Sequence, residues 1–170
     1  MIVDHGRTAV WGTGMSCHSC LLRPKSRGEV TLESADPFAD PLIDPNFLSH
    51  PDDVKDMVDG YKIMMQVLNQ KPFSKYIKEH THRPVDINND SDIELAIREE
   101  ADTVYHPVGT CKMGSDEMSV VNDRLKVHNM NNLRIVDASI MPTLVGGNTN
   151  APTIMIGEKA SDMIKEDWKI

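Results

Sequence analysis

The sequence lacks several features that would assign a protein to a class at once. Three cysteines among 170 residues are too few for a disulfide framework. No apolar run approaches the roughly 20 residues that span a bilayer, and the first residues lack the pattern of a signal peptide. The formal net charge of −8 provides no basic surface, which argues against nucleic acid as a partner. The composition therefore indicates a soluble globular protein with one core of ordinary size.

Local motifs for cofactors and metals are equally scarce. The chain contains no GxGxxG, P-loop, GxSxG or HExxH motif, so any cofactor must be held mainly by something else. Cys17 and Cys20 have CxxC spacing, but neither a second such pair nor a surrounding βαβ pattern accompanies them, which favours ordinary cysteines. We expect Cys111 to be a small buried residue and not a nucleophile. His80 and His82 have no third ligand nearby and are expected to be solvated.

The strand pattern is short and interrupted. Period-2 alternation and apolar starts predict strands at residues 21–24, 28–34, 120–129 and 133–142. In the second of these, Val30 and Leu32 are expected to point inward. Residues 35–53 contain four X-Pro steps, and each proline favours extended geometry in the residue before it. We therefore expect an ordered loop and not a helix in that stretch.

Three segments have helical periodicity. In the first, Ser49 can cap, Pro51 suits the first turn, and Asp52 and Asp53 complement the helix dipole. Its predicted inward face consists of Val54, Met57, Val58, Tyr61, Met64, Met65 and Leu68. A shorter helix is expected to open at Asp90 or Ser91 and to bury Ile93, Ala96 and Ile97. A closing helix is expected from about Ala151 to Asp167, with burial available to Ile154, Ile156, Ala160, Met163 and Ile164.

Two places combine polar chemistry with forced backbone geometry. The first is YHPVGTCKMG at 105–114, where Pro107 and Gly109 disfavour helix and strand, so that the bend would aim His106. The second is VGGNTNAPTIMIGEK at 145–159, where two glycines lead into a helix start. A helix N-terminus favours an anion or developing negative charge. Taken alone, His106 is more often an ordinary histidine, and Asn150 could simply cap the helix.

Three segments together resemble the C-terminal part of the glucose–methanol–choline (GMC) family of flavin oxidoreductases, most closely the animal branch that includes FAD-dependent glucose dehydrogenase. They are LLRPKSRGEVTLESADPFADPLIDPNFLSHPDDV, YHPVGTCKMG and LRIVDASIMPTLVGGNTNAPTIMIGEKASDMI, in the order found in the family. The resemblance implies an α+β substrate-binding domain, a mostly antiparallel sheet backed by helices, over residues 21–168. Residues 1–20 fall outside the match.

The resemblance also implies site residues. His106 matches the family's catalytic histidine, which takes the substrate hydroxyl proton as hydride leaves for the flavin. Asn148 matches a second active-site position, occupied in the family by His or Asn. The residues that match FAD-lining positions are Asp137, Ala138, Asn148, Thr149, Asn150, Ala151 and Pro152.

The implied activity is that of an FAD-dependent dehydrogenase acting on the CH–OH group of an alcohol or sugar. FAD would be held mainly by an N-terminal domain that these residues do not include, and a quinone or other electron acceptor is compatible with the family. An extracellular location is compatible as well. We therefore expect the chain to be part of a longer gene product. The alternative is a short, stand-alone binding or structural module that has lost its flavin.

Overall fold

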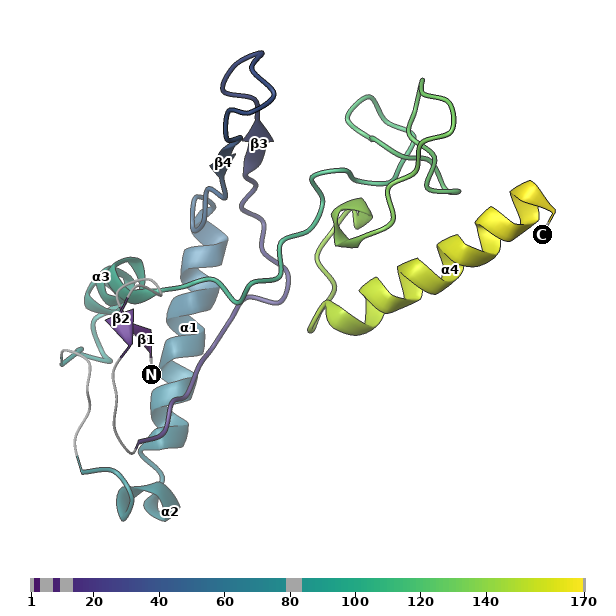
Figure 1. Ribbon diagram of the computed structural model, residues 1–170. Coiled ribbons are helices and arrows are strands. Elements are labelled where there is room, and N and C mark those ends of the chain that lie inside the picture. Colours follow the sequence, from purple (N-terminus) through teal and green to yellow (C-terminus); the bar gives the residue numbers. More distant parts are fainter. Residues whose placement is uncertain (1, 4–7, 10–13, 79–83, 170) are drawn as a thin grey trace. The chain divides into compact units, whose positions relative to one another are not determined.

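The computed structural model describes residues 2–3, 8–9, 14–78 and 84–169. Within them the chain divides into two compact units, each mixing helices with a small antiparallel sheet, in agreement with the predicted α+β class (Figure 1). The first unit contains residues 1–27 and 45–104, and the second contains residues 28–44 and 105–170. The candidate site residues all belong to the second unit.

The first unit is built around helix α1, Pro51–Leu68. The predicted first-turn proline is confirmed, and all seven residues of the predicted inward face are buried or half-buried. The cap is His50 and not Ser49, because the His50 ring nitrogen Nδ1 accepts a hydrogen bond from the Asp52 amide at 3.1 Å. The short helix α2, Lys71–Ser74, follows.

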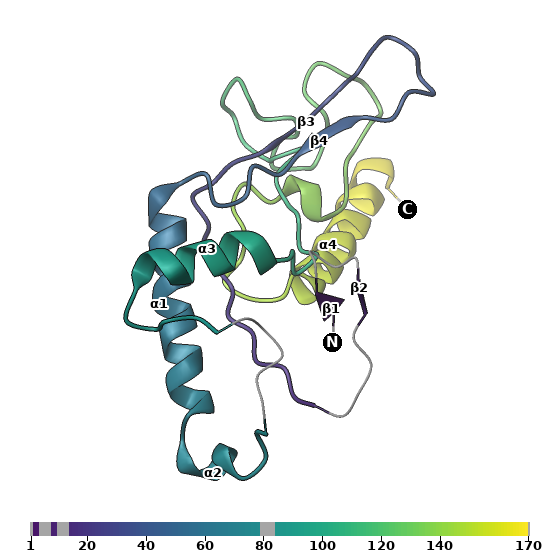
Figure 2. The same cartoon turned by 90° about the vertical axis from the view of Figure 1, so that its left-hand side faces the viewer.

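Helix α3, Asp90–Glu100, packs across α1 and completes the core of the first unit (Figure 2). Val58 of α1 meets Ile93 and Ile97 of α3, which are both buried as predicted. The Asn89 side chain caps α3 by accepting hydrogen bonds from the backbone of the first turn. Strand β1, Ile2–Val3, pairs antiparallel with strand β2, Thr8–Ala9, and each strand has two residues.

The start of α1 is fastened to the segment before it by a buried carboxylate. Asp53 is 2% exposed and accepts hydrogen bonds from the Lys25 amide at 2.8 Å, the Ser26 amide at 2.7 Å and the Ser26 hydroxyl at 2.5 Å. Burial alone would raise the pKa of Asp53, but the hydrogen bonds from Ser26 and Lys25 outweigh it and lower that pKa below the ordinary 3.8. The predicted strand at 21–24 does not form, and this stretch is an irregular approach to that anchor.

The second unit begins with a hairpin of two short strands. Strand β3, Glu29–Thr31, pairs antiparallel with β4, Leu42–Asp44, so the expected loop at 35–53 contains a strand between two of its prolines. Val30 and Leu32 are 48% and 84% exposed, against the prediction that both point inward. A two-stranded ribbon has no interior of its own, so alternation along it does not guarantee burial.

The predicted strands at 120–129 and 133–142 are also wrong. That region contains single bridges, such as Val121 with Val127, and a 3-10 helix η1 at Ala138–Ile140. Leu125 and Asn129 in the first stretch, and Asn132 between the two stretches, have φ near +60°, which a regular strand does not contain. The chain there turns back on itself repeatedly instead of running straight.

Helix α4, Asn150–Trp168, closes the second unit and confirms the predicted C-terminal helix. Ile156 and Ala160 pack in a core with Val121, Leu125 and Ile140. The predicted burial of Ile154 and Ile164 is not observed, since these side chains are 58% and 37% exposed. The apolar stripe that α4 buries within this unit is therefore narrower than its composition suggests.

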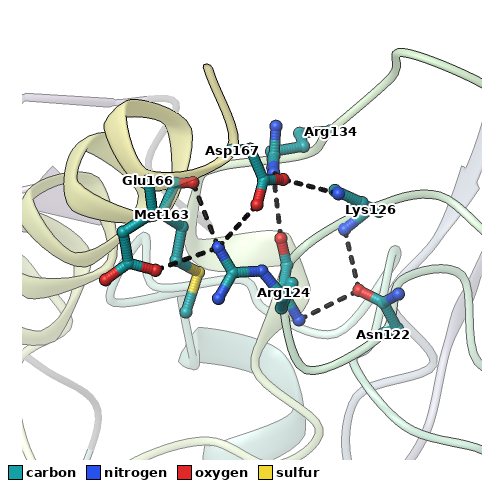
Figure 3. Close-up of polar contacts among 7 residues, drawn as sticks. All are labelled: Asn122, Arg124, Lys126, Arg134, Met163, Glu166 and Asp167. Atoms are coloured by element: carbon teal, nitrogen blue, oxygen red, sulfur yellow. Dashed lines mark hydrogen bonds and ion pairs between the residues drawn. The ribbon is translucent and has the colours of Figure 1, made fainter. Parts of the chain in front are cut away.

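A cluster of charges ties the C-terminal end of α4 to the loop before η1 (Figure 3). Asp167 lies 2.5 Å from Lys126 Nζ and 2.8 Å from Arg124 Nη2, and it also pairs with Arg134. The pKa of Asp167 is lowered to about 2, mainly by the hydrogen bond from Lys126 and further by Arg134 and Arg124. Asn122 shapes the same loop by accepting hydrogen bonds from the Arg124 and Lys126 amides. Among the described helices, none combines the length and apolar character needed to cross a membrane.

Candidate functional site

The segment around His106 is a bend, as Pro107 and Gly109 predict. It contains neither helix nor strand until a single bridge at Met113. Tyr105, immediately before the histidine, has φ of +60°, and Gly109 has φ of +92°. A Cβ at Gly109 would lie 3.3 Å from the Met141 carbonyl oxygen, so both its conformation and its space suit glycine. His106 itself is half-buried.

Backbone hydrogen bonds fix this bend against η1. The Cys111 amide donates to the Ser139 carbonyl at 3.0 Å, and the Met113 amide donates to the Ile140 carbonyl at 2.8 Å. The Asp137 side chain caps η1 by accepting from the Ser139 amide at 2.7 Å. These hydrogen bonds therefore join the bend that follows His106 to η1 and its cap, which contain the predicted FAD-lining residues Ala138 and Asp137.

The start of α4 is unusually open. Thr149 occupies the N-cap position but makes no side-chain capping hydrogen bond, and the first turn contains no acidic residue. Asn150, for which capping was the alternative role, is instead the first helical residue and is exposed, as are Ala151 and the preceding Asn148. Pro152 lies in the first turn as predicted. The first backbone N–H groups of this helix thus have no capping side chain of their own.

The hydroxyl that could cap α4 is used elsewhere. Thr149 is 8% exposed, and its Oγ1 lies 3.0 Å from His106 Nδ1. The Thr149 carbonyl in turn accepts from the Thr153 amide at 3.0 Å and from the Thr153 hydroxyl at 2.7 Å. The imidazole is consequently attached at one nitrogen to a residue that the helix backbone holds in place.

Sequence reasoning treated Thr149 as one of several FAD-lining residues and did not anticipate this contact. The two residues are separated by 43 positions, and the sequence around either residue does not predict a contact with the other. The structure brings His106 and Thr149 together. Within the described part of the chain, it shows no hydrogen bond from His106 to Asn148 or Asp137.

The other polar candidates among the described residues give no site. Cys17 and Cys20 are exposed with free thiols, and the free Cys111 is only half-buried, which falls short of the predicted buried position. Among the described residues, no group of three His, Cys, Asp or Glu side chains is placed to hold a metal ion. His80 and His82 lie outside the described residues, so their predicted solvation stays a prediction.

Comparisons with known proteins converge on one family. The family model described as GMC oxidoreductase matches residues 24–157. An alcohol dehydrogenase (acceptor) of Pseudomonas putida is 50% identical over 161 residues, which cover 95% of this chain and 29% of that protein. An oxygen-dependent choline dehydrogenase of Escherichia coli K12 is 42% identical, with the same coverage.

Solved structures give the same result. A formate oxidase of Aspergillus oryzae RIB40, studied for its FAD modification, superposes with a TM-score of 0.82 at 32% identity, over 88% of this chain and 26% of that chain. A pyridoxine 4-oxidase of Mesorbium loti gives 0.76 at 28% identity, over 83% and 28%. The chain spans less than a third of the length of the curated relatives that it matches.

Proposed function

The chain belongs to the GMC oxidoreductase family, and from this we propose that it is the substrate-side domain of an FAD-dependent oxidoreductase that oxidises the CH–OH group of an alcohol. Two similar relatives are named for an alcohol and for choline, which is itself an alcohol, and this supports an alcohol donor. A glucose dehydrogenase-like specificity stays a prediction. The observation that carries the proposal is the fixed imidazole of His106 beside an uncapped helix start.

The residues at the start of α4 fit the electron-rich edge of a flavin. Exposed residues and uncapped N–H groups, with no carboxylate in the first turn, form a positive helix end that is open to a partner. We propose that Asn148, Thr149, Asn150, Ala151 and Pro152 line FAD there, and that Asp137 and Ala138 contribute from η1. When bound, FAD would supply the hydride acceptor for the reaction.

His106 is the proposed base. An alcohol is a poor proton donor at neutral pH, so its oxidation is helped by a group that removes the hydroxyl proton as hydride departs. Histidine is the side chain whose ordinary titration range suits that task. With Nδ1 engaged by Thr149, the nitrogen that would take the proton is Nε2.

Asn148 is proposed as an electrostatic partner and not as a second base. Its exposed amide can donate a hydrogen bond but cannot accept a proton at neutral pH. Together with the N–H groups of α4, it would stabilise negative charge that develops during the reaction. His106 then carries the proton transfer alone.

The rest of the enzyme would supply what this chain does not contain. No GxGxxG motif occurs in these 170 residues, so we propose that another part of the protein holds the FAD pyrophosphate and packs against this domain. The alternative is a stand-alone binding or structural module without flavin. Purified complete protein that is colourless after reconstitution with FAD would favour that alternative.

The experiment that tests the base is stopped-flow reduction of the complete protein by a good alcohol donor. We expect His106→Gln to slow reduction by roughly a hundredfold or more, the scale typical of losing a general base. Flavin occupancy, measured in the same samples, should stay close to the wild-type value. A reduction rate unchanged in flavin-replete protein would remove His106 as the base. A rate lost only in proportion to lost flavin would assign it a packing role.

A further inference from the structure

We infer that Thr149 is a positioning residue for His106: it accepts a hydrogen bond from Nδ1–H and so leaves the Nε2 lone pair free for the substrate proton. This inference rests on the proposed function, because only a base at position 106 needs one tautomer. Its structural basis is the 3.0 Å separation of Thr149 Oγ1 and His106 Nδ1. A hydroxyl can donate to Nδ1 or accept from Nδ1–H, and only the second arrangement leaves Nε2 unprotonated and able to take the substrate proton.

Thr149 is suited to this role because its hydroxyl is not used for capping. A threonine at an N-cap ordinarily accepts from the helix backbone two or three residues ahead, and here it makes no such bond. The side chain is also 8% exposed, so bulk water competes little for the hydroxyl. The hydroxyl therefore orients the imidazole in place of stabilising the helix.

The backbone on both sides limits how far this pair can move. The Thr149 carbonyl is held by two hydrogen bonds from Thr153, at 3.0 Å to its amide and 2.7 Å to its hydroxyl. On the other side, His106 follows Tyr105, which has φ of +60°, and precedes a proline. A histidine fixed at its backbone and at Nδ1 keeps one ring orientation, which a base must have to meet its substrate.

The substitution that isolates this role is Thr149→Val, which keeps the β-branched shape and removes the hydroxyl. In the complete, flavin-replete protein, we expect reduction to slow by about tenfold, the value of one lost hydrogen bond of this kind. Thr149→Ser restores a hydroxyl and should recover most of the rate. Ser161→Ala is the control, because it removes a hydroxyl from an exposed position further along the same helix that contacts neither His106 nor Thr149, and it should leave the rate near wild type.

The tautomer itself is a second readout that does not depend on turnover. In the complete protein labelled with ¹⁵N-histidine, the His106 signals are assigned by their loss in His106→Gln. We expect Nδ1 of wild-type His106 to carry the proton, and Thr149→Val to shift the population towards Nε2–H. Thr149→Ser should restore the wild-type pattern.

These outcomes separate the inference from the proposed function. An unchanged tautomer and an unchanged rate in Thr149→Val would overturn the positioning role, while a slow His106→Gln would leave the base in place. A changed tautomer in Thr149→Val with a fast His106→Gln would overturn the base and would limit Thr149 to fixing the ring. A defect in Thr149→Val that Thr149→Ser does not recover would mean packing and would also overturn the positioning role.

Discussion

The two long helices of this chain begin in opposite ways. At the start of α1, the His50 ring caps the backbone, two aspartates occupy the first turn, and one of them, Asp53, is buried under three hydrogen bonds. At the start of α4, no side chain caps the backbone and no acidic residue is present in the first turn. Both helices have a proline in the first turn, so the difference lies in polar side chains and not in backbone preference.

The difference indicates what each helix end does. The positive end of a helix is stabilised by negative charge, and a chain can supply that charge from its own side chains or leave the position open to another molecule. Helix α1 uses its own carboxylates, which anchor the segment at Lys25 and Ser26. Helix α4 does not, and the one hydroxyl available for capping is given to His106. We interpret the α1 start as structural and the α4 start as functional.

Mutation at the start of α1, which is capped by its own side chains, should reduce stability the most. We expect Asp53→Asn to destabilise the first unit by about 2 kcal/mol, the scale for losing hydrogen bonds to a buried charged acceptor. An asparagine retains one oxygen, but its NH₂ group would face the Ser26 donors now served by the second carboxylate oxygen. Urea unfolding followed by circular dichroism measures the change. Asp52→Asn, which removes the same charge from the exposed neighbour, should cost much less.

The same carboxylate predicts a pH dependence. Because the native state lowers the pKa of Asp53 below 3.8, the unfolded chain binds this proton more readily than the native one. Its stabilisation is therefore complete above the unfolded value, about pH 4, and is lost as pH falls through the lower native pKa. We expect the stability difference between wild type and Asp53→Asn to be constant near neutral pH and to shrink below about pH 4. A difference that grows on acidification would contradict this assignment.

A mutation can supply the negative charge that the start of α4 lacks. Asn150→Asp places a carboxylate in the first turn of α4, where it should stabilise the helix by about 0.5 kcal/mol. The same charge would oppose the electron-rich flavin edge, and we expect FAD affinity of the complete protein to fall about fivefold, the effect of about 1 kcal/mol, as for two like charges about 4 Å apart in water. Fluorescence titration with FAD measures this. Asp52→Asn at α1 should leave FAD affinity unchanged, and equal effects of the two variants would remove the distinction between the helix starts.

The smallest effect is expected at the other end of α4. Asp167→Asn weakens the cluster with Lys126, Arg124 and Arg134. Arg134 is 15% exposed, but Lys126 and Arg124 are 46% and 38% exposed, and ion pairs with such side chains contribute little. We expect a small drop in the thermal midpoint in dilute buffer that disappears near 1 M salt, roughly where the screening length falls to 3 Å. A large, salt-independent loss would show that the cluster fixes α4 more strongly than surface pairs do.

The sequence predicted the helices well because periodicity acts over many residues. The inward face of α1 and the buried positions of α3 follow from 3.6-residue spacing, and both are confirmed. The strands were harder, since short alternating runs carry little information. Residues 120–129 alternate as a strand would, yet Leu125 adopts φ of +62° and the chain turns there. The local sign of a turn is Asn122-Asp123, since Asn and Asp favour turns and Asn122 accepts hydrogen bonds from the Arg124 and Lys126 amides.

At the candidate site, too, one feature could be predicted from the sequence and another could not. The bend around His106 could be predicted from Pro107 and Gly109, because proline and glycine disfavour helix and strand interiors wherever they occur. The attachment of His106 to Thr149 could not, because it depends on how two distant segments pack in the second unit. The capping of α1 by His50 was missed for a related reason. Serine is the commoner cap, and the choice depends on the local backbone.

The contrast between the two helix starts can be measured directly by hydrogen–deuterium exchange of the complete protein with and without FAD. The peptides to compare are those covering the first turn of α4, at residues 149–153, and the first turn of α1, at residues 51–55. We expect FAD to slow exchange of the α4 amides and to leave those of α1 unchanged, because the first α1 amides already donate to the ring or carbonyl of His50, whereas α4 has no capping side chain. No protection at α4, or equal protection at both helix starts, would contradict the assignment of α4 as the flavin-facing end.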